Sequence, residues 1–213
     1  MEYLRIRTLT EISLARWIKL LLGFAGIGLG VTFMKQSQLG LSPWEVLHDG
    51  ISKVSGYQLG TVSIFIGALV LILWIPMGEK PGIGTVLNIL LIGTVTNLTL
   101  PIVPLADQIL VQVLWLILGL LGIGLGTALY LNSRLGAGPR DGLMLGFYRR
   151  TGQSIRLVRT VLEIIVLVIG WRLGGTLGFG TLAYALTIGP IIQLMFRFLG
   201  DHELASNQRN KPA

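Results

Sequence analysis

The sequence predicts an all-α fold: a polytopic membrane helix bundle of six transmembrane helices. These helices form two inverted three-helix repeats, each with a short broken or re-entrant helix. Three observations support this prediction. The chain of 213 residues is 52% hydrophobic and 13% charged, whereas a soluble domain carries about 25% charge. It contains six long apolar segments. It also repeats itself at a fixed offset, for example between Leu39 and Leu135 (135 − 39 = 96).

The six apolar segments have the length that membrane-crossing helices need, about 20 residues each. Charged residues up to Lys19 and the lack of a small-residue cleavage site indicate that the first segment is retained. The segments are Trp17–Met34, Gly60–Pro76, Gly84–Leu100, Val111–Leu131, Leu157–Leu173 and Gly180–Leu199. They divide the chain into a cytoplasmic segment 1–16, a first repeat 17–100, a linker 101–110, a second repeat 111–199 and a disordered cytoplasmic tail 200–213.

The internal repeat is stronger than composition explains. Residues 18–98 align with 114–194 without a gap, with 26 identities in 81 positions, and 11 of these pair glycine with glycine. Random placement of 29 glycines in 213 residues would give about 1.5 such pairs. The two halves are therefore expected to share one structure.

Charge predicts the orientation of the halves. Each half contributes three crossings, an odd number, so the second half is expected to enter the membrane upside down. With the N-terminus inside, only Lys35, Lys53 and Arg172 of the 17 lysines and arginines fall outside. This positive-inside bias predicts a multi-pass protein of the bacterial cytoplasmic (inner) membrane with both termini in the cytoplasm.

A proline-led phrase occurs once in each half, as "LGLSPWEVLHDG" and "LGAGPRDGLMLG". In the first copy Ser42 is the expected N-cap, Pro43 the first helical residue and Glu45 the third, which is the pattern of a capping box. Gly138 and Asp141 take the corresponding positions in the second copy. Each phrase predicts a helix too short to cross the membrane.

Two compatible interpretations of these short helices stay open. In one, their N-termini face each other near the midplane and offer N–H groups to an anionic or polar group, with Glu45 and Asp141 in proton or cation coupling. In the other, the acids only cap their helices. His48 and Asp49 receive less weight, because the second half has no acid or imidazole at their positions.

Glu163 is the most deeply placed acid, with Arg159 one turn before it. The spacing allows an ion pair. A charge inside a membrane helix is a functional-site hypothesis by default, and a structural pair near the cytoplasmic interface is the alternative.

Polar residues also recur at matched positions of the third and sixth apolar segments. Asn88 corresponds to Tyr184, and Asn97 corresponds to Gln193. They predict either hydrogen bonds between helices or the lining of a cavity.

Glycine stripes on the first and fourth segments predict close packing of these two helices on each other. The stripes are Gly23, Gly26 and Gly30, and Gly119, Gly122 and Gly126.

The chain resembles the YczE/YyaS/YitT group of bacterial integral membrane proteins. The resemblance is carried by "LGLSPWEVLHDGIS", "GIGLGTALYLNSRLGAGPRDGLMLGFYRRTG" and "LGGTLGFGTLAYALTIGP". It implies a multi-pass protein of the bacterial cytoplasmic membrane, and it implies neither an activity nor a substrate.

The predicted function is secondary transport of a small polar or anionic solute through a midplane site between the repeats. The alternative is a membrane-embedded helper, scaffold or sensor acting through a protein partner, and a channel is a third option. No cofactor, metal or nucleic-acid partner is expected, and with no cysteine and two histidines no catalytic set is recognisable, so we do not expect an enzyme. Homo-oligomerisation stays open. Arginines expected to contact anionic lipid headgroups at the cytoplasmic face are Arg149, Arg150, Arg156 and Arg159.

Overall fold

The structure is a computed structural model that describes residues 13–200, where every regular element is a helix and none is a strand. The helices are α1 (Leu14–Ser37), α2 (Pro43–Ser55), α3 (Leu59–Met77), α4 (Ile83–Thr99), α5 (Ile109–Ser133), α6 (Pro139–Thr151), α7 (Ile155–Arg172) and α8 (Phe179–Phe198). The predicted all-α class is therefore confirmed. The predicted segments 1–16 and 200–213 lie almost wholly outside the described residues.

The helices repeat with the offset found in the sequence. α6, α7 and α8 begin 96 residues after α2, α3 and α4 (139 − 43, 155 − 59, 179 − 83), and α5 begins 95 residues after α1 (109 − 14). Each half therefore contains three long helices and one short one in the same order.

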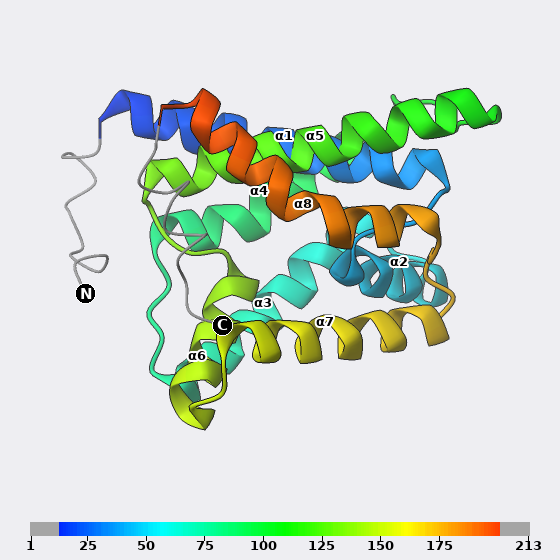
Figure 1. The fold of residues 1–213 in the computed structure, drawn as a ribbon. Coiled ribbons are helices and arrows are strands. Elements are labelled where there is room, and N and C mark those ends of the chain that lie inside the picture. The colour runs from blue at the N-terminus through cyan, green and yellow to red at the C-terminus, as the bar shows by residue number, and fades with distance from the viewer. Residues whose placement is uncertain (1–12, 201–213) are drawn as a thin grey trace.

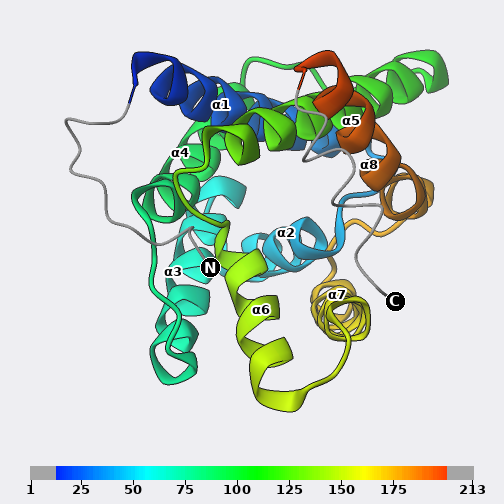
Figure 2. The ribbon, with the colours of Figure 1, turned by 60° about the vertical axis from the view of Figure 1, so that its left-hand side comes forward.

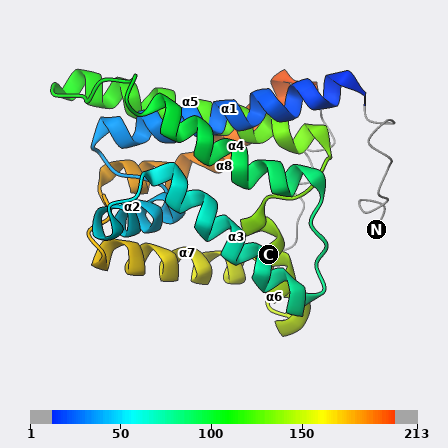
Figure 3. The same ribbon diagram turned by 180° about the vertical axis from the view of Figure 1, so that it is seen from behind.

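The most extensive helix contact in the described residues is between α1 and α5, which run side by side along one edge of the molecule (Figures 1 and 3). Their contact is made by glycine. A methyl group at Gly30 would lie 2.8 Å from the carbonyl oxygen of Gly119, and one at Gly23 would lie 2.8 Å from that of Gly126. The two backbones touch, so the predicted packing of the glycine stripes on each other is confirmed.

Next to this pair, helices of one half pack on helices of the other half. α2 of the first half packs on α7 of the second, and α3 packs on α6. The indole Nε1 of Trp74 on α3 donates a hydrogen bond to the carbonyl oxygen of Pro139 at the start of α6, at 3.0 Å. Each short helix thus packs on a long helix of the opposite half.

One contact breaks the equivalence of the halves. α3 packs closely on α4, where Asn97 Oδ1 accepts from the Gly60 amide at 2.8 Å and Asn97 Nδ2 donates to Thr61 Oγ1 at 2.9 Å. The described parts of α7 and α8 have no comparable packing, and Figure 2 shows these helices well separated. The second half is therefore more open than the first.

The outer surface of the bundle is apolar. Large side chains that are more than half exposed include Phe65, Leu69 and Ile72 on α3 and Leu110 on α5. Soluble monomers rarely expose apolar surface on this scale, so these faces suit contact with lipid.

The predicted membrane spans are supported in part. Each of the six apolar segments coincides with a long helix, but only four described helices, α1, α3, α5 and α8, are long and apolar enough to cross a membrane. α4 is apolar but has 17 residues. α7 carries four charged residues, Arg156, Arg159, Glu163 and Arg172.

Candidate functional site

The repeated phrases form the first turns of α2 and α6. Both helices have 13 residues and a proline at the start, and both are too short to cross the hydrocarbon layer. Ser42 and Gly138 precede them in extended conformation. The short helices are confirmed.

The predicted capping box of α2 is wrong. The Ser42 side chain accepts no hydrogen bond from the helix, and the carboxylate of Glu45 points to other partners. Glu45 Oε1 accepts a hydrogen bond from Arg140 Nη2 at 2.6 Å. A charge-assisted bond of this kind is about twice as strong as one to a neutral N–H, so the tertiary partner wins over the local cap.

The ion pair between Glu45 and Arg140 joins the first turn of α2 to the first turn of α6. The Glu45 side chain is 6% exposed and that of Arg140 is 34% exposed. The guanidinium of Arg140 also lies over the ring of Trp44, 5.1 Å from its centroid, where a cation is attracted by the ring. The two phrases therefore meet directly, as facing N-termini would.

Glu45 has a second buried partner on its own helix. Its Oε2 lies 3.0 Å from Nδ1 of His48, whose side chain is 2% exposed. The other ring nitrogen of His48, Nε2, is buried and has no hydrogen-bond partner among the described residues. Glu45 is thus held between an arginine and a histidine.

Asp141, the counterpart of Glu45, lies in a different environment. It is exposed, and its Oδ2 accepts a hydrogen bond from Tyr130 Oη at 2.8 Å. A methyl group at Gly138 would lie 3.0 Å from Asp141 Oδ2, 3.3 Å from Tyr130 Oη and 3.8 Å from Asn88 Nδ2. The second phrase therefore gathers Asn88, Tyr130 and Asp141 around Gly138.

Arg159 and Glu163 form the predicted ion pair on α7, with Arg159 Nε 2.9 Å from Glu163 Oε1. Their side chains are 52% and 29% exposed. Tyr184 on α8 is half-buried and packs against the apolar core that contains Val46, the residue after Glu45.

The residues of the site are more buried at the start of α2 than at the start of α6. Every residue from 41 to 50 is buried, whereas Ala137 and Asp141 at the start of α6 are exposed. The site is closed on the side of α2 and accessible on the side of α6 and α7.

Two predicted site residues lie elsewhere. Asn97 is used in the contact between α3 and α4, which supports the interpretation as a hydrogen bond between helices. Gln193 is half-buried on α8 and forms no hydrogen bond with the described residues.

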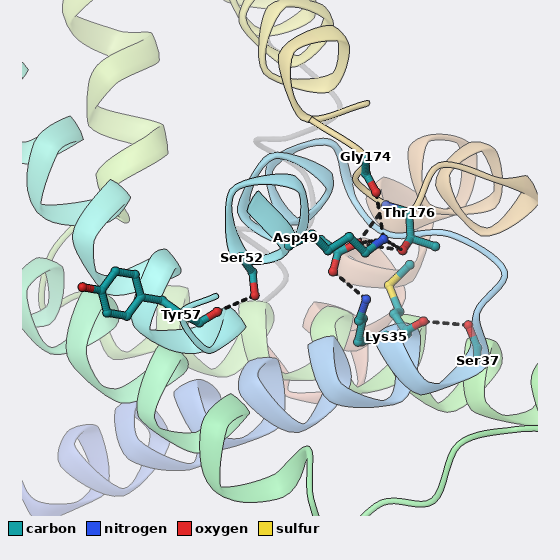
Figure 4. A network of polar contacts seen from close by, with 9 residues as sticks. Lys35, Ser37, Asp49, Ser52, Tyr57, Gly174 and Thr176 are labelled. Carbon is teal, nitrogen blue, oxygen red and sulfur yellow. Dashed lines mark hydrogen bonds and ion pairs between the residues drawn. The ribbon is translucent and has the colours of Figure 1, made fainter. Parts of the chain in front are cut away.

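A second buried acid, Asp49, ties α2 to its surroundings (Figure 4). Asp49 Oδ1 pairs with Lys35 Nζ at 2.5 Å, and Asp49 Oδ2 pairs with Lys53 Nζ at 3.0 Å. The amide and hydroxyl of Thr176, between α7 and α8, donate to Asp49 Oδ2 at 2.8 and 2.7 Å. Asp49 therefore joins the end of α1, α2 and the second half.

Sequence reasoning missed Arg140, Tyr130, Lys35 and Thr176 as site residues, and it gave His48 too little weight. The second half has Met144 at the position of His48, so comparison of the halves gives His48 less weight. A signal within the first half could have identified it. His48 and Asp49 follow Glu45 by three and four residues, a spacing that places their side chains on one face of a helix with it.

A helix bundle with an apolar outer surface, four helices able to span a membrane and an ion pair with a buried carboxylate between its two short helices is a helical membrane protein. The chain belongs to the family described as "Family of unknown function (DUF6198)", which it matches over residues 14–197.

Three bacterial relatives are similar along most of their length. An "Uncharacterized protein" of Haemophilus influenzae is 38% identical over 180 residues, covering 84% of this chain and 83% of the relative. The "Uncharacterized membrane protein YczE" of Bacillus subtilis is 33% identical over 180 residues, covering 84% of each chain. The "Uncharacterized protein YyaS" of the same organism is 29% identical over 192 residues, covering 88% of this chain and 96% of the relative. The resemblance to YczE and YyaS is confirmed. No solved structure matches the chain.

Proposed function

We propose that the chain is a multi-pass protein of the bacterial cytoplasmic membrane, in which six long helices cross the bilayer and the two halves enter it from opposite faces. Each half has three long helices, and an odd number of crossings inverts the second copy. The start of α1 and the end of α8 lie at the same end of the bundle (Figures 1 and 3), as an even total requires. The distribution of lysine and arginine favours the cytoplasm for that end.

In this arrangement the protein is a secondary transporter of a small polar or anionic solute. The observation that carries this function is the ion pair between the buried Glu45 and the partly exposed Arg140, which joins two half-helices at their N-terminal ends. Half-helices that meet between repeats form the substrate and ion sites of many secondary transporters. A purely structural role explains the pair poorly. Well-packed apolar residues often stabilise a protein as much as an ion pair removed from water does, so stability alone does not require charged residues here.

Alternating access would follow from the unequal packing of the halves. α3 is closed on α4 through Asn97, while α7 and α8 are apart. In the alternative state the second half would adopt the packing of the first, so α7 would pack on α8, and α3 would separate from α4. The site would then open to the other face of the membrane. The accessible side in the present state is that of α6 and α7.

The site offers donors for an anion and groups for coupling. Arg140, Arg159, Tyr184 and Asn88 can donate hydrogen bonds. Glu45, Asp141 and Glu163 can exchange protons or hold a cation. Arg149 and Arg156 are exposed near the loop between α6 and α7, where they would contact anionic lipid headgroups.

Flux through liposomes that contain only this protein tests the proposal. We expect a pH gradient to drive uptake of at least one of four labelled probes: acetate, lactate, phosphate and glycine. Arg140→Gln should abolish the uptake. Arg172→Gln, which removes an exposed arginine at the far end of α7, should leave it unchanged. Absence of flux for all four, together with stoichiometric co-purification of a partner protein, would favour the helper function instead.

A further inference from the structure

We propose that Glu45 and His48 form a proton-binding site that controls Arg140, and that Arg140 binds a small monovalent anion when the proton is present. This inference rests on the proposed function, because it names the coupling ion and the substrate class of that site.

The unpartnered nitrogen of His48 is the first observation. Nδ1 of His48 faces a carboxylate oxygen of Glu45 at 3.0 Å. A carboxylate only accepts hydrogen bonds, so Nδ1 carries the hydrogen and Nε2 has the free lone pair. Nε2 is buried, and no described residue donates to it. An unpaired buried polar atom is unfavourable. A proton that binds this lone pair turns Nε2 into a donor, and the positive charge that it brings needs a negative partner.

The charge of the cluster is the second observation. With a neutral imidazole, Glu45 and Arg140 cancel each other. A proton on Nε2 makes His48 a cation, and Glu45 then has two cationic partners, Arg140 at 2.6 Å and His48 at 3.0 Å. A net positive charge in a buried site is unfavourable without a counter-ion. Proton binding therefore creates a place for one negative charge.

Arg140 is the group that takes this anion. His48 can neutralise Glu45 once it is charged, which frees donors of the guanidinium. The Arg140 side chain is partly exposed on the accessible side of the site, whereas Glu45 is enclosed. A guanidinium presents parallel N–H donors that fit planar anions such as carboxylate. One proton and one monovalent anion enter together, and the charge of the cluster does not change.

Charged groups on the neighbouring elements have partners of their own or are exposed, so they do not take the place of the anion. Lys35 of α1 pairs with Asp49, as does Lys53 of α2. Arg159 and Glu163 of α7 pair with each other. α3 has no ionisable side chain. Asp141 of α6 is exposed and accepts a hydrogen bond from Tyr130 of α5, and Tyr184 of α8 is half-buried. The other charged groups of α6, α7 and α8 are exposed arginines: Arg149, Arg150, Arg156, Arg172 and Arg197.

Nitrogen NMR of His48 tests the proposal without any transport measurement. The chain has two histidines, so His202→Gln leaves His48 as the sole imidazole in protein labelled with ¹⁵N-histidine. In liposomes we expect a neutral Nδ1–H form at high pH and an imidazolium at lower pH. Sodium nitrate or sodium acetate at fixed pH should increase the imidazolium fraction. By linkage, anion affinity should fall about tenfold for each pH unit above the midpoint.

Two variants of the same protein sharpen this test. Arg140→Gln should remove the effect of the anion on His48. Arg140→Lys keeps a cation for Glu45 and preserves the fold, but it should weaken the effect because the paired donors are lost. Arg172→Gln should respond as the parent does.

The outcomes separate this proposal from the transport function. A His48 that stays neutral at every pH, or that responds to nitrate and acetate equally in Arg140→Gln, overturns the proton and anion site even if the liposomes show flux. A response to the anion that depends on Arg140, in a protein without flux for any probe, supports the site and overturns transport.

Discussion

Trp44 and Arg140 occupy equivalent positions of the two short helices (140 − 44 = 96), and the guanidinium of Arg140 lies over the indole of Trp44, 5.1 Å from its centroid. Residues 45 and 141, which follow them, are both acidic. The positive charge that only the second copy carries at this position therefore lies where the two copies touch, and it gives Glu45 its counter-charge.

The pairing of Glu45 with Arg140 predicts strong coupling between these residues. Arg140→Gln should lower the free energy of unfolding by about 3 kcal/mol, because it leaves a buried carboxylate without its counter-charge. Glu45→Gln together with Arg140→Gln should cost less than the sum of the two single changes. Denaturant unfolding in detergent measures the cycle, and additive losses would contradict the pairing.

The contact between α1 and α5 predicts different costs for two glycines of one stripe. Gly30→Ala should lower the free energy of unfolding by about 1–3 kcal/mol, because the methyl group would meet the Gly119 carbonyl oxygen at 2.8 Å. Gly26→Ala is the control, since its methyl group would meet no described atom closer than 3.4 Å. Equal thermal unfolding of the two variants would argue against backbone contact at Gly30.

Asn97 holds α3 on α4 by two hydrogen bonds, so Asn97→Ala should lower stability by about 1–2 kcal/mol. If the contact sets the state of the site, this variant should also increase the accessibility of a thiol introduced by Leu59→Cys, at a buried position of α3. Gln193→Ala, at the equivalent position without such bonds, should change neither quantity. A loss of stability for Gln193→Ala that matches Asn97→Ala would contradict the asymmetry.

Inverted halves predict that equivalent residues face opposite sides of the membrane. Ser55 and Thr151, which end the two short helices 96 residues apart, are both exposed. The chain has no cysteine, so Ser55→Cys and Thr151→Cys each introduce a single thiol. An impermeant thiol reagent applied to intact cells should label only the first. Labelling of both from one side would contradict the inverted arrangement.

Glu163 tests whether the pair on α7 is functional. Glu163→Gln should leave the amount of folded protein nearly unchanged, because a partly exposed ion pair contributes about 0–1 kcal/mol. Flux of the transported probe should fall clearly. A loss of folded protein in proportion to the loss of flux would instead mark a structural pair.

The sequence predicted the helices well because their pattern is local and repeated. The apolar segments, the short helices at Pro43 and Pro139 and the glycine stripes each depend on neighbours within a few turns. The ion pair between Glu45 and Arg140 was not predictable in this way. It joins residues 95 positions apart, and local rules favoured a capping role for Glu45 that the structure does not use.

The same limit applies to His48 and Asp49. Comparison of the halves lowered their weight, because Met144 and Leu145 stand in their places. In the folded chain these side chains are buried and bonded to Glu45, Lys35 and Thr176. Repetition in a sequence identifies what the halves share, whereas the polar chemistry of this bundle lies where they have diverged.

The contact of Trp44 with Arg140 cannot form between identical halves. Two copies of one sequence would bring together two tryptophans, or two arginines that repel. An aromatic ring facing a cation requires the halves to differ at this position, so a protein assembled from two copies of either half alone would lack this contact.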